Sequence, residues 1–206
     1  MNTSPYNLEN TLTLAQETFA ACSPLVMAAH SKCSYDPTAQ CFTIPYLNQE
    51  YTVSYPAGRV ATRQQEDADI ITAILILHYL TRASGLALTD NWISFKELQG
   101  GSIYIGPFQN RAIFPFIKTF GTQHATFSRV ATQLGGRQTS FGDLSYVIPV
   151  LPRVPVTYVL WQGDDEFPAN GTILFDQVAN TYLTTEDYAY LASTTVYAMI
   201  KQIKKQ

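Results

Sequence analysis

The sequence predicts an α+β fold, in which a single domain holds a mainly antiparallel sheet flanked by helices. Helical and extended segments follow one another as helix, hairpin, helices, strands and helix, which is not the βαβ alternation of a parallel sheet. The chain has 206 residues, 46% of them hydrophobic and 14% charged, and no linker rich in proline, glycine or serine divides it. We therefore expect one domain over residues 1–206, with a core from about residue 11 to about residue 203.

The first elements are predicted to be two helices and a hairpin. Apolar residues recur at helical spacing over residues 10–22, and Ser23-Pro24 is typical of the start of a second, short helix over residues 24–30. Residues 41–55 then change to an alternating pattern around Asn48-Gln49. This pattern predicts a β-hairpin with its turn at those two residues.

A third helix is predicted over residues 66–83. Glu66, Asp67 and Asp69 stand at its positive end, and Gly85 follows as a stop signal. Its middle is apolar on nearly every side, so we expect it to be central and buried.

Glycine and proline residues predict the element boundaries of the next segment. Gly100-Gly101 is predicted to separate two short extended pieces, and Pro107 to open a helix that Pro115 kinks or ends. A further helix is expected over residues 122–134, before Gly135-Gly136 stops it.

The last third is predicted to contain strands and a terminal helix. Residues 146–176 hold three runs rich in β-branched and aromatic residues, separated by turn residues. Thr185 is predicted to cap the helix, with Glu186 and Asp187 in its first turn, where the helix dipole favours acids.

Composition excludes several partners. The net charge of -3 leaves no basic stripe for a phosphate backbone, so no nucleic-acid partner is expected. No run approaches the roughly 20 apolar residues of a membrane span, so no membrane partner is expected, and no signal peptide is visible. Cys22, Cys33 and Cys41 are an odd number without a close pair, which favours a reducing compartment and a cytoplasmic protein.

His78 is the first candidate site residue, because it interrupts the apolar face of the third helix. A buried imidazole must find a partner, since leaving it unpaired costs about 1–3 kcal/mol. One interpretation is a core histidine bonded to a backbone carbonyl or a carboxylate. The other is an axial ligand to a tetrapyrrole or corrinoid, with Tyr79, Trp92 and Trp161 as candidate aromatic contacts.

The charged candidates lie in the locally acidic last third. Asp164, Asp165 and Glu166 form the densest acidic string, which can bind a divalent metal ion, act as acid and base, or lie in an exposed turn. Arg153 is held between two prolines on a segment that we expect to be stiff and extended. It can serve as an internal ion-pair partner or hold an anionic ligand.

Six segments taken together resemble a known family. They are ILHYL at 76–80, WISFKEL at 92–98, LPRVPV at 151–156, LWQGDDEFP at 160–168, ILFD at 173–176 and TED at 185–187. Over roughly residues 19–200 the chain resembles a bacterial and archaeal family of unknown function, the domain-of-unknown-function family numbered three-seven-eight-six. The resemblance implies a protein of anaerobes, some of whose relatives carry an added iron–sulfur domain similar to that of corrinoid methyl-transfer proteins. This chain lacks the clustered cysteines of that domain, so the resemblance implies no iron–sulfur cluster here. It favours a function related to a cofactor or a corrinoid.

Three functions remain open from the sequence. The first is a cytoplasmic accessory protein that binds a small-molecule ligand or cofactor, with a tetrapyrrole or corrinoid as the most specific candidate. The second is an enzyme that uses the acidic cluster on a small anionic substrate. The third is a module whose weakly charged surface meets a protein partner or a second copy.

Overall fold

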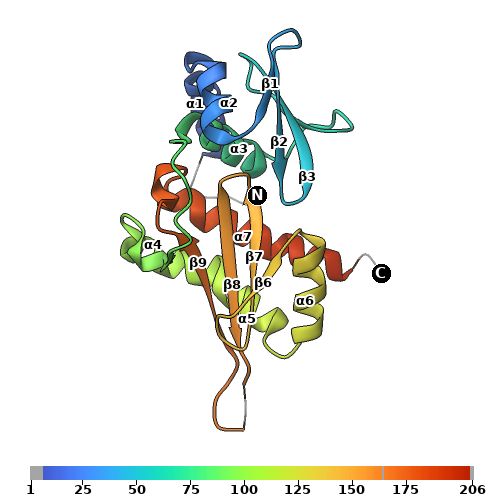
Figure 1. The fold of residues 1–206 in the computed structure, drawn as a ribbon, viewed down its shortest axis with the longest axis vertical. Coiled ribbons are helices and arrows are strands. Elements are labelled where there is room, and N and C mark those ends of the chain that lie inside the picture. The colour runs from blue at the N-terminus through green and yellow to red at the C-terminus, as the bar shows by residue number, and fades with distance from the viewer. Residues whose placement is uncertain (1–6, 164, 205–206) are drawn as a thin grey trace. The chain divides into compact units, whose positions relative to one another are not determined.

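The computed structural model describes residues 7–163 and 165–204 and divides into two compact units. Unit 1 contains the described residues up to 86, and unit 2 contains those from 87 onward. Each unit has its own antiparallel sheet and its own helices (Figure 1). The predicted α+β class is therefore confirmed, although the strands form two sheets instead of one. The expectation of one domain for the whole chain stays a prediction.

Unit 1 packs helices against a four-stranded sheet. Its elements are α1 (Leu8–Ala21), α2 (Pro24–Ser31), β1 (Ser34–Asp36), β2 (Cys41–Tyr46), β3 (Gln49–Ser54), β4 (Val60–Thr62) and α3 (Ile70–Arg82). The strand order is β1-β2-β3-β4. Phe42, Ile44 and Val53 point to one face and are fully buried, and the ring of Phe19 from α1 lies 5.6 Å from that of Phe42. The alternation thus places an apolar face of the sheet beneath the helices.

Helix α3 is buried as predicted, but it begins later than Glu66. Asp69 is its N-cap, and the carboxylate of Asp69 accepts a hydrogen bond from the Thr72 N–H at 3.0 Å. Asp67 precedes the helix, and its carboxylate lies 2.7 Å from Nε of Arg59. Asp69 therefore caps the helix and Asp67 pairs outside it, although the sequence predicted both in the first helical turn.

The turn of the β2–β3 hairpin lies one residue earlier than predicted. Tyr46 pairs with Gln49, so the two loop residues are Leu47 and Asn48. Both have positive φ, 50° and 60°. A two-residue hairpin loop in which both φ values are positive matches the twist of the flanking strands. Asn48 is a residue type typical of such a loop, whereas Leu47 is not, so the sequence indicated only one of the two loop positions.

Unit 2 is built on a five-stranded sheet. Its elements are β5 (Trp92–Ser94), α4 (Gly101–Phe108), α5 (Phe114–Phe120), α6 (His124–Gln133), β6 (Arg137–Thr139), β7 (Leu144–Leu151), β8 (Val154–Trp161), β9 (Asn170–Asp176) and α7 (Thr185–Ile203), with 3₁₀ turns at Phe95–Glu97 and Ala179–Thr181. The strand order is β5-β9-β8-β7-β6, and every neighbouring pair is antiparallel. The three predicted strand runs of residues 146–176 are confirmed as β7, β8 and β9.

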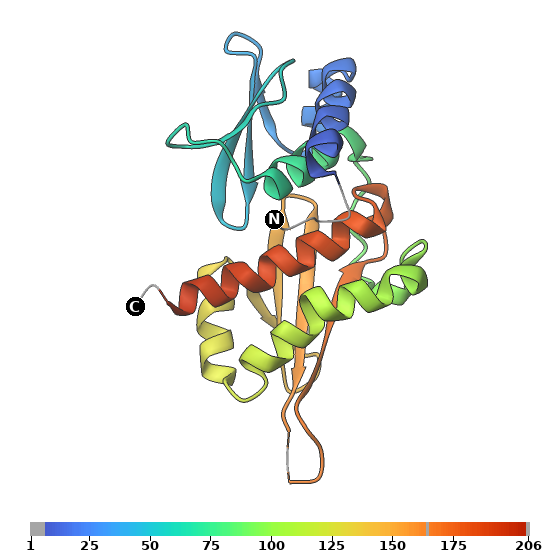
Figure 2. The same cartoon turned by 180° about the vertical axis from the view of Figure 1, so that it is seen from behind.

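Helices cover one face of this sheet. Figure 2 shows α7 running alongside the α4–α5 segment in front of the strands. Tyr158 of β8 points into this layer, where its ring lies 5.3 Å from that of Phe116 and its hydroxyl donates to the Ala192 carbonyl at 3.2 Å. The core of unit 2 therefore lies between the central strands and the helices.

The segment after Gly100 is helical, so the expected extended piece before Pro107 is wrong. Gly101 begins α4, Pro107 lies inside it, and a π-helical turn over Gln109–Ile113 leads into α5. Pro115 stands in the first turn of α5, directly after the π-helical turn, which the Phe114 N–H closes by donating to the Gln109 carbonyl. Local glycine and proline signals gave the wrong structure here because burial of apolar residues such as Phe108 stabilises the helical run.

Helix α7 has its N-cap at Thr184 and not at the predicted Thr185. The Asp187 N–H donates to the Thr184 hydroxyl at 3.1 Å, and the Asp187 carboxylate accepts from the Thr184 N–H at 3.0 Å. This reciprocal pair is a capping box. Neither α7 nor any other helix in the described parts of the chain is long and apolar enough to cross a membrane.

Candidate functional site

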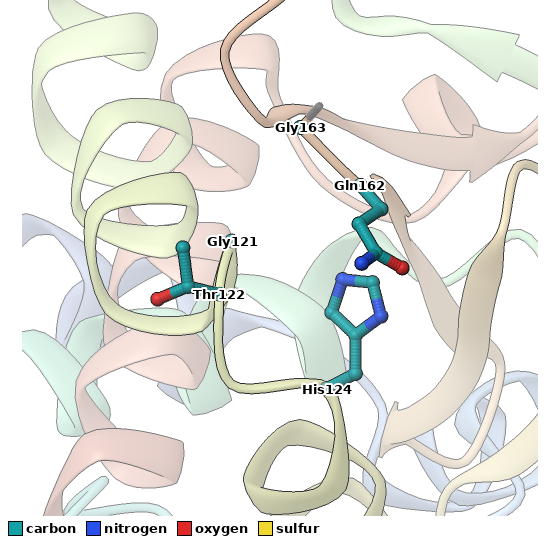
Figure 3. A pocket seen from close by; sticks show the side chains of 5 residues that line it. All are labelled: Gly121, Thr122, His124, Gln162 and Gly163. Carbon is teal, nitrogen blue, oxygen red and sulfur yellow. The ribbon is translucent and has the colours of Figure 1, made fainter. Parts of the chain in front are cut away.

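A pocket of about 330 Å³ lies in unit 2, between the α5–α6 turn and the start of the β8–β9 loop. Gly121, Thr122 and His124 form one wall, and Gln162 and Gly163 form the other (Figure 3). This volume is at the lower end of the range for small-molecule sites. The pocket is therefore sized for a small ligand.

Two glycines of the pocket walls stand where a side chain would clash. A Cβ on Gly121 would lie 2.8 Å from the Ala169 Cβ and 2.7 Å from the Ile117 carbonyl oxygen. A Cβ on Gly163 would lie 2.5 Å from the Ala169 backbone nitrogen. All three distances are shorter than a real Cβ allows. Glycine at residue 121 therefore lets the α5–α6 turn lie against the β8–β9 loop, and glycine at residue 163 lets that loop fold on itself.

Asp143 holds the loop that carries the second wall. Its carboxylate accepts a hydrogen bond from the Gln162 N–H at 2.7 Å, and the Asp143 N–H donates to the Leu160 carbonyl at 3.0 Å. A charged acceptor makes the stronger kind of hydrogen bond. Asp143 therefore positions the backbone of Gln162 at the pocket.

His124 supplies the most distinctive polar group of the site. It is the first residue of α6, and its imidazole points across the pocket toward the Gln162 carboxamide (Figure 3). Its Nε2 is buried and has no hydrogen-bond partner among the residues that the structure describes. An unpaired buried polar atom costs about 1–3 kcal/mol, so a ligand atom that bonds to Nε2 would recover that free energy.

The predicted residues of unit 1 lie on α3. Tyr79 is fully buried, and its hydroxyl donates to the Ser31 carbonyl at 2.7 Å, as expected of a core tyrosine. His78 is half-buried on the same helix. Nothing in unit 1 tests whether His78 binds a macrocycle, and that role stays a prediction.

The predicted residues of unit 2 do not converge. Trp92 pairs with Asp176 and Trp161 with Asn170, which places the two tryptophans at opposite ends of β9. At about 3.3 Å per residue these ends are roughly 20 Å apart. Arg153 lies in the tight turn between β7 and β8 and not on an extended segment. These three side chains therefore do not fit one shared wall for a tetrapyrrole or corrinoid.

The described acids of the string, Asp165 and Glu166, follow the second pocket wall along the chain and do not line the pocket. Asp164 lies outside the described residues, and Asp165 and Glu166 are exposed in the β8–β9 loop. Within residues 7–163 and 165–204, no three His, Cys, Asp or Glu side chains gather as a metal site would require. Metal binding by the string stays a prediction, while its neighbours Gln162 and Gly163 line the pocket.

Sequence reasoning did not single out His124. The available signal was a histidine two residues after Gly121-Thr122, where one helical run ends and the next begins. That signal is weak, because the second wall of the site lies far along the chain, after β8.

The Cys33 thiol in unit 1 is buried, and its burial predicts slow alkylation. It is 7% exposed, and burial raises its pKa from 9.0 to about 11, partly opposed by a hydrogen bond with Ser31. The thiol therefore stays protonated as the pH rises past 9. At pH 8 we expect iodoacetamide to modify Cys33 at least about 100-fold more slowly in the native protein than in urea, because two pKa units lower the thiolate fraction about 100-fold. Peptide mass spectrometry of timed samples measures both rates, and equal rates would contradict the prediction.

Together these features define a class of protein: an α+β protein with a small polar pocket beside the start of a helix. The chain belongs to the family described as Domain of unknown function (DUF3786), which it matches over residues 23–198. Comparison with curated proteins and comparison with solved structures each found no match.

Proposed function

We propose that this chain is a cytoplasmic accessory protein that binds a small polar ligand or cofactor in the pocket at His124. The observation that carries the proposal is the buried Nε2 of His124, which lacks a partner among the described residues and belongs to a pocket wall. The three free cysteines support a reducing compartment.

The pocket supports binding more than catalysis. Of its five lining residues, only Thr122 carries a hydroxyl that is a potential nucleophile. Figure 3 shows the Thr122 side chain pointing away from the His124 imidazole. A nucleophile and its base must lie within hydrogen-bond reach, and this pair does not have that arrangement.

A histidine-resolved titration tests the proposal. The full chain, labelled with ¹⁵N-histidine, is titrated with a panel of small carboxylates, phosphates, amides, nucleotides and zinc chloride while the side-chain nitrogen signals are recorded. We expect at least one compound to shift the His124 signals saturably, because a bond to Nε2 changes its protonation or tautomer. The same compound should bind at least tenfold more weakly to His124→Ala.

His30→Ala is the matched control. Nδ1 of His30 lies 3.1 Å from the Ala83 carbonyl in unit 1, so this nitrogen already has a partner within the fold, away from the pocket. This variant should retain the affinity of the unmodified chain. If no compound in the panel shifts His124, or if both variants lose binding equally, the pocket is not the ligand site.

The same protein tests the macrocycle prediction. Haemin and hydroxocobalamin are added separately, and their absorption spectra are followed. An axial imidazole would change the spectrum, and the change would be lost in His78→Ala. An unchanged spectrum, or a change that persists in His78→Ala, excludes His78 as the ligand.

A further inference from the structure

We propose that the pocket at His124 recognises a small oxyanion, namely a carboxylate or phosphate group, held against the first turn of α6. This inference rests on the proposed function and adds the chemical class of the ligand. The observations concern the start of α6 and the groups that line the pocket beside it.

The first turn of α6 is an uncompensated positive end. The initial N–H groups of any α-helix have no partner within the helix. The N-cap residue Gln123 makes no side-chain capping bond, and the first turn contains no acidic residue. The peptide dipoles therefore present partial positive charge at His124, and this residue lines the pocket.

Side chains add donors to the same space. When the Nε2 of His124 carries the proton, it is a buried donor for which the described residues supply no acceptor. The Gln162 carboxamide reaches toward it from the other wall (Figure 3). Because Gln162 is exposed, its side chain can rotate aside and leave Nε2 to a ligand oxygen. An oxyanion has several acceptor oxygens, which matches donors that come from two directions.

An acidic group near the pocket limits the charge of the ligand. The carboxylate of Asp143 accepts a hydrogen bond from the Gln162 N–H at the second pocket wall. This negative charge opposes a highly charged anion, so a ligand with one carboxylate or phosphate group fits the site best.

Sodium acetate and sodium phosphate are the probes. Each is titrated into the ¹⁵N-labelled full chain at constant ionic strength, set with sodium chloride. We expect saturable shifts of the backbone amides of His124, Ala125 and Thr126 and of the His124 side chain. Gln123→Asp should weaken binding at least tenfold, because its own carboxylate competes for the same N–H groups. Gln123→Ala, which adds no charge, should stay within about twofold of the unmodified chain.

The outcomes separate this inference from the proposed function. Saturable binding of acetate alone identifies a carboxylate site, and binding of phosphate alone identifies a phosphate site. If neither anion binds but zinc chloride or a neutral compound of the panel shifts His124, the oxyanion inference is overturned and the proposed function stands. If nothing in the panel shifts His124, both are overturned. Unchanged affinity in Gln123→Asp overturns the placement at the start of α6.

Discussion

Asp176→Ala is expected to lower the free energy of unfolding by about 3 kcal/mol or more. Asp176 is 2% exposed, and its carboxylate accepts four hydrogen bonds: from the Thr89 N–H at 3.0 Å, the Thr89 hydroxyl at 3.0 Å, the Asp90 N–H at 2.9 Å and the Val178 N–H at 3.0 Å. Alanine removes both carboxylate oxygens, so all four hydrogen bonds are lost and the Thr89-Asp90 segment before β5 is no longer held to the end of β9. Urea unfolding followed by circular dichroism measures the change.

Asp143→Ala is the matched control for this prediction. Asp143 is exposed, and its carboxylate accepts one hydrogen bond, from the Gln162 N–H. Its loss should be about 1 kcal/mol, since water can replace an exposed acceptor. Equal losses in the two variants would show that the hydrogen bonds of Asp176 do not stabilise unit 2 as described.

Gly101→Ala is expected to destabilise the protein by about 3 kcal/mol or more, through overpacking against backbone that cannot move cheaply. A Cβ on Gly101 would meet the Phe95 carbonyl oxygen at 1.9 Å and the Phe95 carbonyl carbon at 2.9 Å. Phe95 is itself buried, with its ring stacked 3.9 Å from that of Phe108. The start of α4 would have to move away from the core.

Gly106→Ala in the same helix provides the control. A Cβ at Gly106 meets nothing within 4 Å, so alanine should stabilise the helix by about 0.5–1 kcal/mol through its lower backbone entropy. Urea titrations of both variants give the comparison. If Gly101→Ala unfolds at the same urea concentration as the unmodified chain, the close approach to Phe95 is not a constraint.

Much of the fold could be predicted from local patterns. The apolar spacing of residues 10–22 predicted α1, the apolar run after Asp69 predicted a buried α3, and the β-branched runs of residues 146–176 predicted β7 to β9. These predictions hold because periodicity and burial agree over each segment. The segment from Gly101 to Pro107 did not follow its local signals, because packing of α4 against its neighbours outweighs them.

The candidate site was predicted only in part. The acidic string after Trp161 marked the loop that carries one wall of the pocket, and Gln162 and Gly163 at its start line that wall. The two tryptophans were expected to contact one macrocycle, but the strand pairing places them at opposite ends of β9. Arg153 was expected on an extended segment, but it lies in the turn between β7 and β8. The sequence did not predict which of these residues lie together, because the pairing register of the strands decides which strand ends are neighbours.

The sequence by itself determined the α+β class, the antiparallel strands, the helix caps to within one residue at α7 and the family. Those properties follow from local periodicity, turn residues and motif order, all of which are written along the chain. Only the tertiary structure placed His124 opposite Gln162, gave its Nε2 a buried position and required glycine at residues 121 and 163. Except for the contacts of Gly163 within its own loop, these facts depend on segments far apart in the sequence, and such contacts exist only after the α5–α6 turn packs against the β8–β9 loop.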